Sequence, residues 1–483
     1  MPRNLLFYVA VLLVFGTGIW LMLGQGAQLE PSAAAMSTAP AQAASGHGAQ
    51  ASGIDALVAN LKHPVALLLL QVLVIVIAAR SLGTLFRKMG QPSVIGEMLA
   101  GILLGPSLLG WVIPASQSFL FPADSLTPLK MLSQIGVILF MFVVGIELDL
   151  GHLREKAHSA VLVSHASIIV PFFLGIAGAL FLYRQTAPEG LPFLPFALFF
   201  GVSMSITAFP VLARILNDRK LTGTHLGTTA LACAAVDDVT AWCLLAVVVA
   251  LVKATGVTSA LWTIGLSVTF IGFMLFVVRP QLARMTRVAS SPWSGGSGLV
   301  ALHLTVVFAS ALVTEVIGIH ALFGAFLAGV CMPPDPALRR FLRERIETFS
   351  TVFLLPLFFA FTGLRTEIGL LNDWQGWLLC LGVVALAIAG KLGGTMVAAR
   401  FTGMSWADSF SLGALMNTRG LVELIVLNIG FELGVLSPRI FTMLVLMALV
   451  TTFMTGPLLS LCQMVQRRRR GEEQDFAMEP EAA

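Results

Sequence analysis

Charged residues are scarce in this chain. Only 11% of the 483 residues are Asp, Glu, Lys or Arg, and 57% are hydrophobic, whereas soluble domains carry about 25% charged residues. This composition, with a mean hydropathy of +0.90, excludes an ordinary soluble domain and predicts an all-α polytopic membrane protein in a lipid bilayer. The net charge of +4 is too small to indicate a nucleic-acid partner.

Cysteine is also rare, and the positions of the five cysteines exclude two kinds of site. Their spacing fits neither a zinc site nor a disulfide framework, so we expect no metal cofactor. We interpret them as small core residues: they are Cys233, Cys243, Cys331, Cys380 and Cys462. The chain also lacks a Thr-Val-Gly-Tyr-Gly filter, which argues against a potassium-channel pore.

Apolar segments, by contrast, follow one another along the chain. Residues 1–24 carry Arg3 and a long apolar run, which indicates a signal peptide or, as we favour, a retained anchor helix. Residues 25–60 are rich in Ala, Ser, Gly and Gln and predict a disordered periplasmic linker; residues 464–483 are a short tail. The transmembrane domain, 62–463, should contain about thirteen spans: 62–80, 92–113, 128–148, 158–183, 191–216, 226–252, 259–278, 298–316, 319–332, 350–364, 375–399, 408–431 and 438–463.

The basic residues predict how these spans cross the membrane. If residue 62 lies outside, most loop lysines and arginines fall on the inner side, including the run from Arg467 to Arg470. The positive-inside rule then predicts an odd number of spans and a cytoplasmic C-terminus. We therefore expect a multi-pass protein of a bacterial-type inner membrane.

Two adjacent acidic residues, Asp237 and Asp238, lie in the middle of the sixth predicted span. Near the centre of a ~30 Å hydrocarbon layer, a charged side chain costs roughly 2.5–3.5 kcal/mol on insertion scales. One carboxylate of the pair should therefore hold a proton, bind a cation or contact a basic residue. Such a pair can exchange a proton for a cation, although it can also form a purely structural buried network.

Two spans are expected to be interrupted. The fifth contains Ser205, Thr207 and Pro210. Proline removes a backbone N–H and breaks the helix, and nearby hydroxyl groups can bond to the backbone groups that the break leaves unpaired. The twelfth contains Asn417 and Thr418 before a glycine. If spans 1–6 and 8–13 form two repeats, both breaks lie in the fifth helix of a repeat, and the repeats insert in opposite senses. Secondary transporters have this inverted-repeat pattern and bind substrates beside the broken helices.

Other ionisable residues in the spans allow two interpretations each. Lys391 either pairs with Asp237 or extends its side chain to the membrane interface. Arg419 and Glu423 share one helix face and form either a structural ion pair or part of the ion path. Glu97 lies near the cytoplasmic start of the second span, where it either lines the entrance or caps a neighbouring helix.

Together these motifs resemble the monovalent cation:proton antiporter-2 family, which includes Kef-type, NapA-type and plant CHX carriers. The resemblance rests on GEMLAGILLGP at 96–106, FMFVVGIEL at 140–148, SITAFP at 205–210, the aspartate pair, and NTRGLVE at 417–423. It implies an NhaA-like fold and a homodimer. Spans 4–6 and 11–13 would form a moving core, and spans 1–3 and 8–10 a dimer scaffold.

The resemblance also implies roles for individual residues. In that family the second acidic residue, here Asp238, binds the cation, and the first, here Asp237, pairs with the lysine that matches Lys391. Ser205 and Thr207 would border the site. The chain departs from CHX-like motifs at Asp237, where asparagine is usual, and it lacks the nucleotide-binding tail of Kef carriers. A double acid favours electrogenic exchange.

The leading hypothesis is therefore a transporter, not an enzyme, that exchanges Na⁺ or K⁺ for protons by alternating access. A channel-like K⁺ efflux pathway, a cation-coupled solute symporter and a receptor with an inactive transporter core are the alternatives. A symporter would need a larger pocket with solute-binding groups. The Asp237–Asp238 pair and Lys391 argue against an inactive core.

Overall fold

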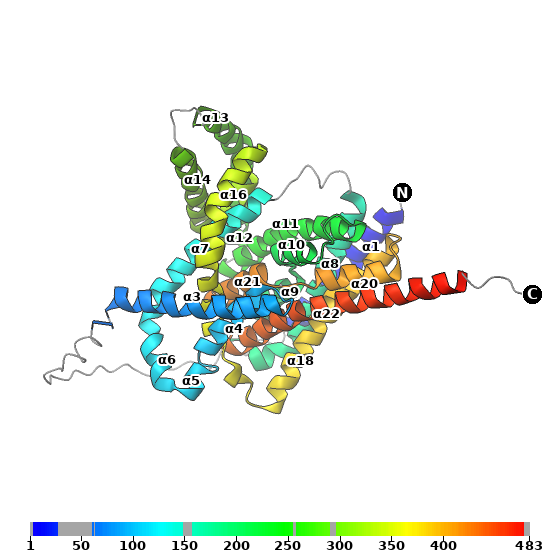
Figure 1. Ribbon diagram of the computed structural model, residues 1–483, viewed down its shortest axis with the longest axis horizontal. Coiled ribbons are helices and arrows are strands. Elements are labelled where there is room, and N and C mark those ends of the chain that lie inside the picture. The colour runs from blue at the N-terminus through cyan, green and yellow to red at the C-terminus, as the bar shows by residue number, and fades with distance from the viewer. Residues whose placement is uncertain are drawn as a thin grey trace, which may run out of the picture.

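The computed structural model describes residues 3–27, 60–61, 63–147, 157–254, 257–289 and 296–477. Throughout these ranges the regular structure is helical (Figure 1), as the composition predicts. Most of the predicted linker, 25–60, lies outside the described residues. Residues 25–27 continue the first helix, and the last helix extends into the predicted tail as far as Ala477.

The helices occur in the following order along the chain. The first half contains α1 (Arg3–Ala27), α3 (Pro64–Lys88), α4 (Ser93–Leu104), α5 (Leu109–Val112), α6 (Pro114–Leu120), η1 (Ala123–Ser125), α7 (Leu126–Glu147), α8 (Ala157–Thr186), α9 (Phe193–Ser205), α10 (Phe209–Asp218), α11 (His225–Lys253), α12 (Val257–Phe273) and η2 (Met274–Val278). The second half contains α13 (Arg279–Ala289), α14 (Gly296–Ile317), α15 (Ala321–Val330), α16 (Pro336–Phe349), η3 (Ser350–Leu354), α17 (Leu355–Leu364), η4 (Ile368–Leu371), α18 (Trp374–Ile388), η5 (Ala389–Gly393), α19 (Gly394–Phe401), α20 (Trp406–Met416), α21 (Leu421–Glu432) and α22 (Pro438–Ala477).

Every predicted span contains helix, but the ninth and tenth differ from expectation. In the described ranges, eleven helical segments are long and apolar enough to cross a membrane, and the bent pair α20–α21 makes a twelfth. The ninth predicted span is α15, whose ten residues rise about 15 Å, half of a ~30 Å hydrocarbon layer. The tenth belongs to a longer segment, Pro336–Leu371, because the arginine-rich helix α16 looks like a loop by hydropathy.

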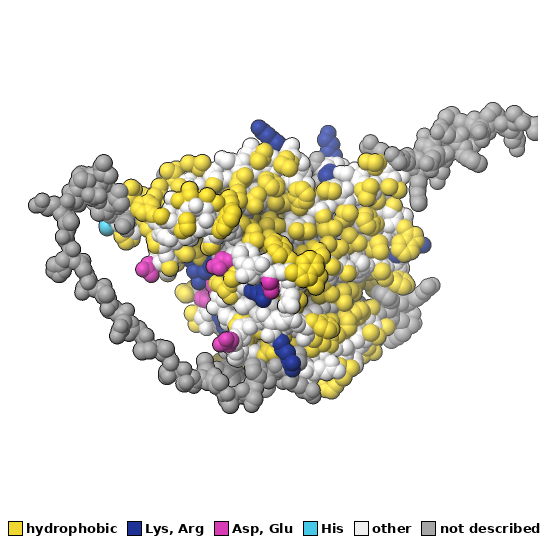
Figure 2. Space-filling model, turned by 90° about the horizontal axis from the view of Figure 1, so that it is seen from below, with side chains coloured by type: hydrophobic (Ala, Val, Ile, Leu, Met, Phe, Trp, Pro, Cys, Tyr) yellow, Lys and Arg dark blue, Asp and Glu magenta, His cyan; other side chains and the backbone are white. Residues whose placement is uncertain are grey.

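The outside of the protein is apolar. Figure 2 shows one face of the molecule, on which hydrophobic side chains predominate and the few charged side chains lie mostly in one central region. Along α3, exposed apolar residues recur every fourth position at Val65, Leu69, Leu73 and Ile77, so they share one helix face. Cys243 of α11 is also exposed. Its interpretation as a core residue is therefore wrong, because a lipid-facing surface has the same apolar composition as a core.

The helices pack in two groups. One contains α3, α4, α7, α14, α15 and α17, the helices of the spans predicted for the scaffold. Small residues permit its close contacts: a Cβ on Gly145 of α7 would lie 2.2 Å from the carbonyl oxygen of Phe326 in α15. In the other, α8 contacts α9, α11, α18 and α19, and α20 contacts α11, α19 and α22. These are the helices predicted for the core.

Helix α1 packs beside the second group. The Phe15 and Phe173 rings of α1 and α8 meet edge to face, with their centroids 4.8 Å apart. A Cβ on Gly18 would lie 2.5 Å from the Phe173 ring, so the absence of a side chain there permits the contact. The first helix is thus in contact with α8, which carries part of the site described next.

Candidate ion-binding site

Two interrupted helices lie at the centre of the second group. Residues 206–208 separate α9 from α10, and residues 417–420 separate α20 from α21, whose axes differ by 44°. The first break precedes Pro210, which lies in the first turn of α10, where a missing N–H has no cost. The break thus lies within the stretch that the sequence predicted, between Ser205 and Pro210.

The two breaks bind each other. The Ala208 amide donates a hydrogen bond of 3.0 Å to the Thr418 carbonyl, and the Thr207 hydroxyl lies 3.0 Å from the Met416 carbonyl, which shares the single hydroxyl proton with Asp237. Backbone groups that the breaks remove from helical pairing are therefore satisfied across the crossing point, as a site without bulk water requires.

Basic side chains donate hydrogen bonds to the last carbonyl groups of α9, which have no donors within the helix. Arg419 donates to the carbonyls of Ser203 and Met204 at 2.6 and 2.7 Å, and Lys391 donates to the carbonyl of Ser205 at 2.5 Å. Cations stabilise the C-terminal end of a helix, where carbonyls are unpaired. The opposite end of the break faces an acid: the Phe209 amide, in the first turn of α10, bonds to Asp238.

Asp237 is the more completely bound carboxylate of the pair. It accepts hydrogen bonds from Ser164 at 2.8 Å, Ser167 at 3.1 Å and Thr207 at 2.6 Å. The Lys391 Nζ lies 2.7 Å from its Oδ2, and neither side chain is exposed. The ion pair expected from the sequence is present, and these four donors form an arrangement suited to an ionised carboxylate.

Asp238 has a different environment. It is buried, with 1% exposure, and its Oδ1 has no hydrogen-bond donor among the described residues. The Oδ1 of Asn417, in the second break, also lacks a partner there. Buried polar atoms normally have partners, so these two oxygens are available to a proton or a cation, as is the unpartnered Oε1 of Glu423 on α21.

Arg419 and Glu423 form a buried pair, with 2.8 Å between Nη1 and Oε2. Because Arg419 also binds the carbonyl end of α9, its contacts favour the structural interpretation, in which it fastens α21 to α9. The Thr418 hydroxyl contacts that of Thr455 in α22 at 3.3 Å. Its side chain is therefore directed toward α22.

A cavity of about 550 Å³ approaches the breaks from the face that carries the predicted inner loops. Pro210, Val211 and Leu421, which follow the two breaks, line it. Glu97 is buried and lies in the same wall, as an entrance residue would. Near the mouth, Arg343 binds Glu147 and Glu347 at 2.5 and 2.7 Å.

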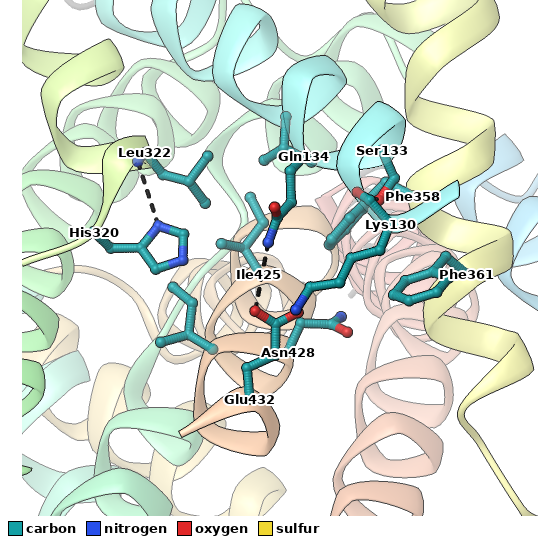
Figure 3. Close-up of a pocket in the computed structure, with 12 residues that line it drawn as sticks. Lys130, Ser133, Gln134, His320, Leu322, Phe358, Phe361, Ile425, Asn428 and Glu432 are labelled. Carbon is teal, nitrogen blue, oxygen red and sulfur yellow. Dashed lines mark hydrogen bonds and ion pairs between the residues drawn. The ribbon is translucent and has the colours of Figure 1, made fainter. Parts of the chain in front are cut away.

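On the opposite face, an ion-pair cluster joins the two helix groups (Figure 3). Glu432, at the end of α21, lies 3.0 Å from Lys130 of α7 and 3.2 Å from Arg365 after α17. Gln134 of α7 donates to the same carboxylate at 3.4 Å. Lys130, Gln134 and Glu432 border a small pocket of about 30 Å³ and also a neighbouring cavity of about 510 Å³, which extends to Leu322 and Ile429.

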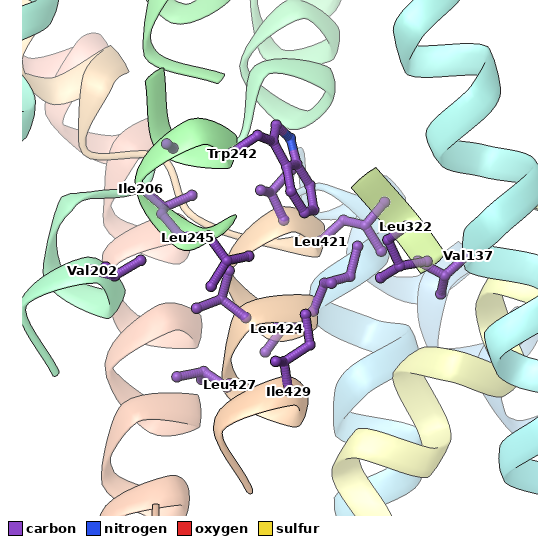
Figure 4. Packing of buried hydrophobic residues seen from close by; sticks show 14 of the residues in the cluster. Val137, Val202, Ile206, Trp242, Leu245, Leu322, Leu421, Leu424, Leu427 and Ile429 are labelled. Carbon is purple, nitrogen blue, oxygen red and sulfur yellow. The ribbon is translucent and has the colours of Figure 1, made fainter. Parts of the chain in front are cut away.

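An apolar layer separates this cluster from the breaks. The part of α21 between Leu421 and Ile429 is packed among buried side chains that include Trp242, Leu245 and Leu322 (Figure 4). Of the cavities described on the two faces, the one lined by Pro210 and Leu421 reaches the breaks, whereas the one on the opposite face ends at Leu322 and Ile429. The site is therefore open toward the face that carries the predicted inner loops.

Two site residues were not found from the sequence. Ser164 and Ser167 of α8 contact Asp237, yet hydroxyls in apolar helices are common and usually bond their own backbone. Their spacing, which places both on one face shortly before Pro171, is the only signal that the sequence offered.

Crossed helix breaks, a buried acid pair and a buried lysine inside a bundle of membrane-length helices define a secondary transporter with an NhaA-like fold. The family model described as "Sodium/hydrogen exchanger, transmembrane" matches residues 72–462. The chain belongs to this family.

Curated relatives agree with this assignment. The Na(+)/H(+) antiporter NhaS4 of Synechocystis is 47% identical over 393 residues, covering 81% of this chain and 96% of that protein. Cation/H(+) antiporter 19 of Arabidopsis thaliana is 41% identical, covering 83% of this chain and 50% of that protein. K(+)/H(+) antiporter 1 of Saccharomyces cerevisiae is 35% identical, covering 85% and 48%. The chain thus spans about half the length of the plant and yeast relatives.

A solved structure shows the same fold. The sodium proton antiporter MjNhaP1 of Methanocaldococcus jannaschii superposes with a TM-score of 0.55, covering 82% of this chain and 98% of that chain. The two sequences are 14% identical, so the likeness concerns the fold alone.

Proposed function

We propose that this chain is a secondary antiporter that exchanges Na⁺ or K⁺ for protons, with Asp238 as the shared cation and proton site. The observation that carries the proposal is the contrast within the acid pair. Asp237 has four donors, whereas Asp238 retains an unpartnered oxygen at the break. The relatives named as Na(+)/H(+) and K(+)/H(+) antiporters support this assignment.

The geometry supports competition at a single carboxylate. Protonated Asp238 is neutral and tolerates burial, and ionised Asp238 needs a cation in its place. Asp237 and Lys391 belong to the same helix group, so their ion pair can move with the site as one unit. Access to Asp238 then alternates when the core helices shift relative to the scaffold.

The described cavities favour exchange over the two transport alternatives. The apolar layer beside Trp242 and Leu421 interrupts the path, whereas a channel needs a continuous pore. Three charged residues that line the cavity reaching the breaks, Arg343, Glu147 and Glu347, are paired with one another, which argues against their binding an organic solute. We also propose that the protein carries out no chemical conversion and needs no cofactor beyond the transported ions.

The test is transport in proteoliposomes that contain a pH-sensitive dye. Na⁺, Li⁺, K⁺ and Rb⁺ are added in turn outside vesicles with a proton gradient, and protein-free vesicles serve as the control. We expect at least one cation to cause rapid proton movement that saturates with its concentration. Cation movement without coupled protons would indicate a channel, and no response to any cation would refute the proposal.

We further propose a homodimer in a bacterial-type inner membrane, with the C-terminus in the cytoplasm. The support for this orientation is the excess of lysine and arginine in the loops on one side of the bundle. The support for a dimer is the resemblance to antiporters that pair through the scaffold helices.

Cysteine labelling tests the orientation. Gly369 and Gly223 lie between spans on opposite sides, and neither has an atom within 4 Å of an added Cβ, so Gly369→Cys and Gly223→Cys should fold normally. With the native cysteines replaced, an impermeant maleimide should label Gly369→Cys in intact cells. Gly223→Cys should react only after the cells are permeabilised. The reverse pattern would invert the proposed orientation.

A further inference from the structure

The ammonium group of Lys391 lies in a cage of oxygen atoms. Its three N–H groups are shared among four oxygens: Asp237 Oδ2 at 2.7 Å, the Ser167 carbonyl at 2.9 Å, the Ser167 hydroxyl at 3.0 Å and the Ser205 carbonyl at 2.5 Å. The lysine is fully buried. Two of its four acceptors are thus backbone carbonyls, which an intact helix would normally use in its own hydrogen bonds.

Each carbonyl is free for a reason that the sequence specifies. Ser205 is the last residue of α9, and the break follows it. The Ser167 carbonyl would normally bond the amide of residue 171, but that residue is Pro171, inside α8. Proline has no N–H. The interior proline of α8 therefore leaves the Ser167 carbonyl without its helical donor at the position that Lys391 reaches.

Glycines bring the lysine segment against this part of α8. Lys391 lies in η5, a π-helical turn. A Cβ on Gly390 would lie 2.8 Å from the Cα of Pro171, and one on Gly394 would lie 2.9 Å from the Cβ of Val170. Larger residues at 390 and 394 would push η5 away from α8. The two glycines and the free Ser167 carbonyl are therefore both needed for the contact between Lys391 and α8.

We infer that Pro171 is a positioning residue for the transport site: by freeing the Ser167 carbonyl, it holds the Lys391 ammonium against Asp237. This inference rests on the proposed function and deepens it. Ser167 takes part through both its carbonyl and its hydroxyl, because the hydroxyl accepts from Lys391 and donates to Asp237. Residues of α8 therefore hold the ion pair of Asp237 and Lys391 in place, and Asp238 remains as the carboxylate that exchanges ions.

Pro171→Ala is the direct test. Alanine keeps the Cα and Cβ that face Gly390, but it adds an N–H that competes with Lys391 for the Ser167 carbonyl. In a Lys391→Ala background the same N–H satisfies a carbonyl that has lost its partner. The Tm change caused by Pro171→Ala in detergent should therefore be more positive in the Lys391→Ala background than in the native one, by at least about 2 °C.

Pro457→Ala is the matched control. Pro457 is also an interior helical proline, in α22, and no contact joins it to Lys391 in the described structure. Its Tm change should be the same in both backgrounds. Equal changes for Pro171→Ala in the two backgrounds would overturn the inference. Because this cycle needs no transport, it remains decisive even if the antiporter proposal fails.

The pH profile of exchange separates positioning from general weakening of the fold. The charged groups that face Lys391 are Asp237 from α11, Arg419 from the second break and Glu423 from α21. Removal of one oxygen acceptor makes the ammonium lose its proton more readily as the pH rises. The alkaline limit of exchange is the pH at which the exchange rate falls to half on the alkaline side of its profile. In Pro171→Ala this limit should therefore move to lower pH by about half a unit or more.

The serine provides a second variant with a conservative rescue. Ser167→Ala should move the alkaline limit in the same direction, and Ser167→Thr, which keeps the hydroxyl, should restore it. Pro457→Ala should leave the limit unchanged. If Pro457→Ala moves the limit as much as Pro171→Ala does, or if neither Pro171→Ala nor Ser167→Ala moves it, Lys391 is not positioned by α8.

Discussion

Replacement of Asp238 by asparagine should abolish cation-dependent proton exchange in a protein that still folds. Asparagine keeps the shape of the side chain but can neither lose a proton nor neutralise a cation. The Phe209 amide that bonds Asp238 can donate to the amide oxygen instead, so the helix break should remain intact. The initial rate in the pH-dye assay should fall to that of protein-free vesicles for every cation tested.

Two controls make this result interpretable. Thermal unfolding in detergent should show that Asp238→Asn is no less stable than the native protein, because the change removes a buried carboxylate with an unpartnered oxygen. Glu344→Gln, on the exposed side of α16, removes a carboxylate outside the site and should retain exchange. Substantial exchange by Asp238→Asn would transfer the role of cation site to another acid.

The sequence predicted the elements of this site better than their mutual contacts. Scarce charge and long apolar segments predict a helical membrane bundle, and two carboxylates in mid-span predict an ion site. The pair of Asp237 and Lys391, 154 residues apart, was foreseen because a buried acid and a buried base need each other. The breaks were predicted because proline and glycine interrupt an apolar helix, and the neighbouring hydroxyl residues can bond to the backbone groups that the break leaves unpaired.

The sequence did not predict which way the side chains at the breaks point or which helix faces pack together. The Thr207 hydroxyl binds Asp237 rather than Asp238, and the Ser205 hydroxyl turns back to the carbonyl of Val202; only its own carbonyl contacts Lys391. Which atom of a break residue faces the site depends on how two broken helices cross. The serines of α8 were missed for the same reason, since the helix face that meets α11 is set by packing.

Loss of Lys391 should destabilise the protein as well as impair exchange. Lys391→Ala leaves Asp237 with hydroxyl donors only, and it leaves the carbonyls of Ser167 and Ser205 without their cation. Breaking a buried ion pair by removing one partner costs about 3–5 kcal/mol. We therefore expect a clear fall in Tm in detergent. If Lys391 also releases a proton during the cycle, the remaining exchange should move less net charge, which a membrane-potential dye can measure.

The double variant distinguishes a true ion pair from two independent residues. Asp237→Asn with Lys391→Ala removes both charges, so neither is left buried and uncompensated. Its Tm should exceed that of Lys391→Ala alone, and the interaction term from the four proteins should be at least about 1 kcal/mol. A recovery of stability without a recovery of exchange would show that the pair holds the site together and is also needed for transport. Strictly additive losses would mean that Asp237 and Lys391 do not meet in solution, and a lysine directed to the membrane interface would then explain residue 391 better.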